Sequence, residues 1–108
     1  MKHIYNKLVR DRIPEIIEAG GAKANYRVLS RVEYIEELKK KLAEEVEELC
    51  NAATEEELIE EMADVRTVLD YISLTFDLDG AVMLKRRDQK HTERGGFRER
   101  IFLESTED

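Results

Sequence analysis

Two long amphipathic stretches separated by a short turn constrain the fold of this chain most. The first opens at Ser30, where Ser30 and Glu33 have the spacing of a capping box, in which each side chain satisfies a free backbone N–H of the other residue. Apolar residues then recur at helical spacing, at Ile35, Leu38, Leu42, Val46 and Leu49. We therefore predict a helix from Ser30 to about Cys50.

The second stretch has the same design. Thr54 and Glu57 form a second predicted capping box directly after the turn at residues 51–53. An apolar stripe follows at Leu58, Met62, Val65, Leu69, Ile72 and Phe76. Because the turn is short, we expect the two helices to be antiparallel neighbours with their stripes facing each other.

Shorter elements flank this pair. Pro14 fits the first turn of a short helix over residues 13–19, and a third long helix is predicted over residues 81–93. Residues 24–29 and 97–103 look extended. The predicted fold is all-α: an antiparallel helical bundle with short extended segments near the N-terminal third and the C-terminus.

Length and composition bound the class of protein. The 108 residues predict a single helical domain over residues 1–108. The third helix is sparse in apolar residues, so we expect a homo-oligomer, a dimer or a tetramer, to complete the core. No apolar run is long enough to span a membrane, and no membrane partner is expected. The lone Cys50 fits a reducing, cytoplasmic location.

Charge is distributed unevenly along the chain. Residues 31–64 contain four basic and thirteen acidic side chains, whereas residues 85–100 contain seven basic and three acidic ones. The first twelve residues are also basic. Nucleic acid is not the expected partner, because an acidic centre opposes it. A metal bound by carboxylates, with basic groups around it for phosphates, would use both signs of charge.

The acidic centre contains two pairs of carboxylates, Glu45 with Glu48 and Glu61 with Asp64, and the members of each pair share one helix face. At about 100° per residue, Glu45 and Glu61 lie about 60° from the centres of their apolar stripes, and Glu48 and Asp64 about 120°. In an antiparallel pair these offsets fall on one side, whereas Glu44 is predicted to point toward solvent. Four converging carboxylates suit a hard divalent cation. Spacing alone also allows ordinary solvated acidic faces.

These residues carry a family resemblance. The segment Glu44-Glu45-Val46-Glu47-Glu48, followed after twelve residues by Glu61-Met62-Ala63-Asp64, resembles the motif of the MazG-like nucleotide pyrophosphohydrolases in the all-α NTP pyrophosphatase superfamily. The opening segment 5–14 and the segment Arg94-Gly95-Gly96-Phe97 are similar to a small branch labelled phosphoribosyl-ATP pyrophosphohydrolase-like.

The resemblance implies hydrolysis of a nucleoside triphosphate between its α and β phosphates, giving the monophosphate and pyrophosphate, with a house-cleaning role against unwanted nucleotides. By motif position, Glu45, Glu48, Glu61 and Asp64 would be the catalytic residues that hold Mg²⁺, or Mn²⁺ in its place. Three alternatives stay open. The first is true phosphoribosyl-ATP hydrolysis, and the second is a non-catalytic nucleotide- or partner-binding helical module. The third, for which the acidic centre argues less well, is nucleic-acid binding by the basic C-terminal stretch.

Basic side chains near both ends are the candidates for binding substrate phosphates, because arginine can hold phosphate oxygens bidentately. The candidates are Lys7, Arg10, Arg12, Lys85, Arg87, Lys90 and Arg94. Asn6 is a further candidate, for a hydrogen bond to the base or sugar. The C-terminal set could equally form a solvated basic helix face.

Overall fold

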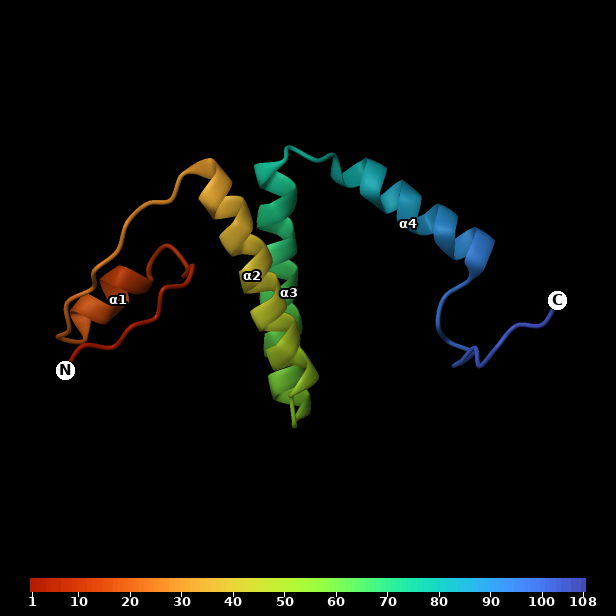
Figure 1. The fold of residues 1–108 in the computed structure, drawn as a ribbon, viewed down its shortest axis with the longest axis horizontal. Coiled ribbons are helices and arrows are strands. Elements are labelled where there is room, and N and C mark those ends of the chain that lie inside the picture. Colours follow the sequence, from red (N-terminus) through yellow and green to blue (C-terminus); the bar gives the residue numbers. More distant parts are fainter. The chain divides into compact units, whose positions relative to one another are not determined.

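The computed structural model describes all 108 residues and contains helices but no strand. The helices are α1 (Ile13–Ala19), α2 (Arg31–Cys50), α3 (Glu55–Thr75) and α4 (Gly80–Arg94) (Figure 1). The all-α prediction is therefore confirmed. Residues 24–29 and 97–103 form no strand, and the second of these begins with a turn in which the Arg100 amide donates to the Phe97 carbonyl at 3.2 Å. A strand needs a neighbouring strand to pair with, and neither segment has one.

The chain divides into two compact units, Met1–Asp77 and Leu78–Asp108. In the first unit, α2 and α3 pack side by side as an antiparallel hairpin joined by a short turn (Figure 1). The second unit contains α4. The predicted antiparallel pairing of these two helices is therefore observed, whereas the bundle itself stays a prediction. None of the helices combines the length and apolar character that crossing a membrane requires.

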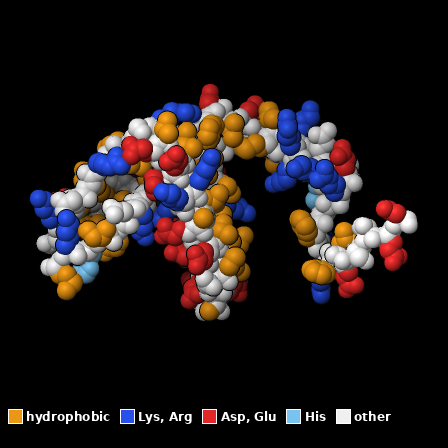
Figure 2. Space-filling model, viewed as in Figure 1, with side chains coloured by type: hydrophobic (Ala, Val, Ile, Leu, Met, Phe, Trp, Pro, Cys, Tyr) orange, Lys and Arg blue, Asp and Glu red, His pale blue; other side chains and the backbone are white.

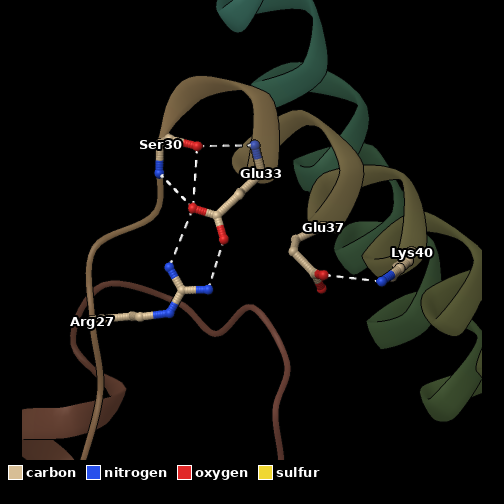
Figure 3. Close-up of polar contacts among 5 residues, drawn as sticks. All are labelled: Arg27, Ser30, Glu33, Glu37 and Lys40. Carbon is tan, nitrogen blue, oxygen red and sulfur yellow. Dashed lines mark hydrogen bonds and ion pairs between the residues drawn. The ribbon is translucent and has the colours of Figure 1, made fainter.

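A capping box begins α2, as predicted. The Ser30 hydroxyl accepts the Glu33 amide at 3.3 Å, and the Glu33 carboxylate accepts the Ser30 amide at 3.3 Å (Figure 3). Arg27 adds two hydrogen bonds to the same carboxylate, at 3.2 and 2.7 Å. The Arg27 contact first, and then Ser30, lowers the pKa of Glu33 to about 2. The carboxylate therefore anchors the preceding segment as well as the helix.

Side-chain hydrogen bonds stabilise both ends of the α2–α3 hairpin. At the turn, Thr54 accepts the Glu57 amide at 3.1 Å, while the Glu57 carboxylate accepts the amide of Ala53 at 2.9 Å. This differs from the predicted box, in which Glu57 would have accepted the Thr54 amide. At the far end, Arg31 donates to the Thr75 carbonyl at 3.2 Å.

The apolar contact inside the hairpin is small. Leu38 and Val68 are the buried apolar side chains of the chain. The α3 stripe was expected to face α2, but four of its members are more than two-fifths exposed: Leu58, Met62, Leu69 and Phe76. On α3 the buried residue is Val68, which is not a member of the predicted stripe. On α2 the buried Leu38 is a stripe member, but the buried Glu45 occupies part of the contact as well.

Candidate metal centre

Three carboxylates from the two hairpin helices meet in one small volume. Glu45 on α2 and Glu61 and Asp64 on α3 each offer an oxygen, and these oxygens lie within 4.8 Å of one another. Glu45 is buried, and the other two are half-buried. One oxygen of Glu45 and one of Glu61, both Oε2, are buried and have no hydrogen-bond partner. Burying an unpaired carboxylate oxygen is costly, and a bound cation would remove that cost.

The acidic side chains lie closer to the helix contact than the sequence predicted. Around the axis of α2, the angle between the buried Leu38 and Glu45 is about 20°. Measured from the buried Val68, Glu61 is about 20° and Asp64 about 40° away around α3. The predicted offsets were larger because they were measured from the centres of the apolar stripes. Those centres do not coincide with the line of contact between the helices.

Glu48, the fourth predicted ligand, lies at the edge of this cluster. Its side chain is exposed, and it is not part of the group of three whose oxygens converge. Its carboxyl is still near enough to raise the pKa of both Glu45 and Glu61. The structure therefore brings together three of the four predicted ligands and leaves Glu48 beside them.

Burial and crowding disfavour the charged forms of these acids. Burial first, and then the neighbouring carboxyls of Glu48, Asp64 and Glu45, raise the pKa of Glu61 to about 7. Burial is also the main cause that raises the pKa of Glu45, while Lys41 opposes this rise. Metal binding requires deprotonated ligands, so a divalent cation would reverse both effects.

Two residues at this site were not among the predicted site residues. Lys41 lies one helical turn before Glu45, with its Nζ 3.4 Å from Glu45 Oε1. Spacing of four residues on one helix is the signal that could have identified it. Glu44 was predicted to point toward solvent, but it is half-buried and pairs with Lys7 at 3.2 Å and Lys41 at 3.7 Å.

The N-terminal candidates divide into two groups. Lys7 reaches Glu44, and Arg10 reaches Asp64, with Nη2 2.9 Å from Oδ1. The structure therefore brings both side chains to the acidic cluster. Arg12 instead pairs with Glu15 at 3.3 Å, within its own turn of helix. Asn6 is exposed and has a left-handed backbone, with φ of 45°.

The C-terminal candidates Lys85, Arg87, Lys90 and Arg94 all lie on α4 of the second unit and are exposed. Arg87 contacts the adjacent Asp88 at 3.5 Å. Arg94 lines a cavity of about 740 Å³ at the end of the helix, together with His91, Phe97, Arg98 and Arg100. The role of these residues in phosphate binding stays a prediction.

Comparison with known proteins identifies no family for this chain. No protein-family profile matches it, and no solved structure matches it. A curated protein of Mycolicibacterium smegmatis, described as uncharacterized, is 50% identical over 54 residues. This match spans 50% of the chain and 55% of that protein, so the chain covers about half the length of this relative.

Proposed function

We propose that this protein is a Mg²⁺-dependent nucleotide pyrophosphohydrolase that cleaves nucleoside triphosphates between the α and β phosphates. The observation that carries the proposal is the convergence of Glu45, Glu61 and Asp64, with two buried oxygens that have no partner. Hard oxygen donors of this kind suit Mg²⁺, or Mn²⁺ in its place. The motif that supplies these acids resembles that of the MazG-like enzymes.

Each group has a defined task in this proposal. Glu45, Glu61 and Asp64 hold the metal, with Glu48 beside them. When bound, Mg²⁺ neutralises phosphate charge and lowers the pKa of a water for attack on phosphorus. Arg10 and Lys7 are positioned beside the acids and supply positive charge for phosphate oxygens.

The direct test is a panel of purified NTPs and dNTPs, with phosphoribosyl-ATP included, incubated with the full chain and Mg²⁺. We expect release of the monophosphate and pyrophosphate from nucleoside triphosphates. Preference for phosphoribosyl-ATP would instead favour the biosynthetic enzyme. Binding of Mg²⁺ and nucleotide in calorimetry, without any turnover, would favour a non-catalytic module.

Matched variants locate the activity at the acidic cluster. Glu45→Gln and Asp64→Asn should abolish turnover while keeping the helical content measured by circular dichroism. Glu47→Gln and Glu60→Gln change exposed acids on the same helices and should keep activity. Equal activity in all four variants would refute the assignment of the cluster as the active site.

We also propose that the hairpin works as a homo-oligomer in the cytoplasm. Val46 on α2, Leu58, Met62 and Leu69 on α3, and Phe76 directly after α3 are each at least 40% exposed. They lie about 80–120° around their helices from the buried Leu38 and Val68, in the same rotational sense. In an antiparallel pair this places them on one side of the hairpin, and Figure 2 shows hydrophobic and acidic side chains gathered mainly on different sides. A second copy that covers this apolar side would complete the core.

A further inference from the structure

A basic N-terminal segment is attached to the acidic cluster by two ion pairs. Lys7 Nζ lies 3.2 Å from Glu44 Oε1, and Arg10 Nη2 lies 2.9 Å from Asp64 Oδ1. These contacts join residues 37 and 54 positions apart in the sequence. Arg10 therefore supplies positive charge to one of the three carboxylates that converge at the candidate metal centre.

The attachment is of a kind that releases easily. The side chains of Arg10 and Asp64 are 61% and 34% exposed, and exposed ion pairs contribute little to stability. The N-terminal segment, residues 1–12, is exposed apart from Leu8, which is half-buried. A stronger competitor for the Asp64 carboxylate could therefore displace Arg10 without disturbing the hairpin.

We propose that Arg10 is a built-in competitor of the divalent cation at Asp64, so that metal binding frees the N-terminal segment at Arg10. Arg10 neutralises Asp64 when no metal is bound, and a divalent cation replaces it. The released guanidinium then lies beside the site with all its N–H donors free for phosphate oxygens. This inference rests on the metal site of the proposed function.

The competition follows from charge and from the carboxylate that Arg10 contacts. Mg²⁺ binds carboxylate oxygens at about 2.0–2.1 Å, closer than the hydrogen bond from Arg10. A doubly charged ion bound by the Asp64 carboxylate repels the guanidinium that contacts the same carboxylate. Coupling between two binding events is reciprocal, so the metal weakens the Arg10–Asp64 pair by the same factor by which Arg10 weakens metal binding. Removing Arg10 should therefore raise the affinity for metal by that factor.

Lys7 provides the matched control. It lies on the same segment and carries the same charge, but it pairs with Glu44, which is outside the group of converging carboxylates. If only the net charge near the site matters, Lys7→Gln and Arg10→Gln will change metal affinity equally. If Arg10 competes for Asp64 directly, Arg10→Gln will have the larger effect.

The test measures Mn²⁺ affinity by isothermal titration calorimetry on the full-length wild type, Arg10→Gln and Lys7→Gln. We expect Arg10→Gln to bind Mn²⁺ roughly two- to fivefold more tightly, the worth of an exposed ion pair, and Lys7→Gln to change affinity less. In addition, saturating Mg²⁺ should speed hydrogen–deuterium exchange of the amides around Arg10 in the wild type. It should leave exchange there unchanged in Arg10→Gln.

The possible failures are distinguishable. Tight Mn²⁺ binding that is equal in the wild type and Arg10→Gln, or equally changed by Lys7→Gln, overturns the competition and leaves the metal site intact. Unchanged exchange in the wild type on adding Mg²⁺ does the same. Absence of Mn²⁺ binding in all three proteins overturns both the metal site and this inference.

Discussion

Lys41 and Glu45 lie one turn apart on α2, with Nζ of the lysine 3.4 Å from Oε1 of the glutamate. Their side chains are 19% and 9% exposed, so this is the most buried ion pair of the chain. The other oxygen of Glu45, Oε2, has no hydrogen-bond partner. Lys41 therefore holds one carboxylate oxygen and leaves the second one available inside the cluster.

The first prediction concerns this pair. Lys41→Gln should raise the pKa of Glu45 further, because Lys41 is the group that favours the charged carboxylate against burial. The pKa can be followed by carbon NMR of the side-chain carboxyl in the metal-free protein. Lys40→Gln is the control, since Lys40 pairs with Glu37 at 3.1 Å, and it should leave the Glu45 pKa unchanged. An equal pKa of Glu45 in the wild type and Lys41→Gln would contradict the assigned role.

The second prediction is a pH dependence of stability. The pKa of Glu61 is about 7 in the fold and 4.5 ordinarily, so the folded state binds more protons between these values. Its contribution to stability is fully present below about pH 4.5 and is lost as pH rises through 7. Urea unfolding of the metal-free protein at several pH values measures this fall.

Glu61→Gln should flatten that pH profile, because the amide does not titrate. Glu60→Gln changes an exposed neighbour and should keep the wild-type slope. If the wild type and Glu61→Gln lose stability equally across this range, Glu61 is not the titrating group.

The third prediction tests the exposed apolar side of the hairpin. Leu69→Lys should dissociate the oligomer, because it places a charge where a second copy would pack, and analytical ultracentrifugation measures the mass. Leu74→Lys is the control. Leu74 is 71% exposed and lies on the other side of α3, about 120° from Val68 in the opposite sense. A wild type that is monomeric at every concentration would exclude this role for the apolar side.

The fourth prediction concerns the start of α2. Ser30→Ala should lower the free energy of unfolding by about 1 kcal/mol, because the Glu33 amide loses its hydrogen-bond acceptor. Chemical unfolding gives this value. Ser105→Ala, in the exposed C-terminal segment, should have no effect. A loss as large at Ser105 would show that the method does not report on the helix cap.

The helix boundaries were predictable because the signals for them are local. Ser30 with Glu33 and Thr54 with Glu57 act within one turn of helix, and so they mark the start of α2 and α3 in the sequence. The helical spacing of apolar residues then indicates how far each helix continues. The same local spacing identified the acidic pairs from which Glu45, Glu61 and Asp64 come.

The rotation of each helix about its own axis was not predictable in this way. Stripes of apolar residues indicated a contact centred on them, but the packed hairpin buries Glu45 and leaves Leu69 and Phe76 exposed. Several residues compete for one narrow line of contact, and the free energy of the whole pair selects among them. Local spacing contains no information about that choice.

The two N-terminal cations at the cluster, Lys7 and Arg10, depend on the tertiary structure most of all. Nothing near Arg10 in the sequence indicates Asp64 as its partner, since the two are 54 residues apart. Their contact exists because the hairpin places Asp64 where the segment before α1 can reach it. The sequence thus determines which helices form and which acids they carry, because those depend on neighbours within a turn. Packing of distant segments determines which acids converge and which cations meet them, because charge acts through space.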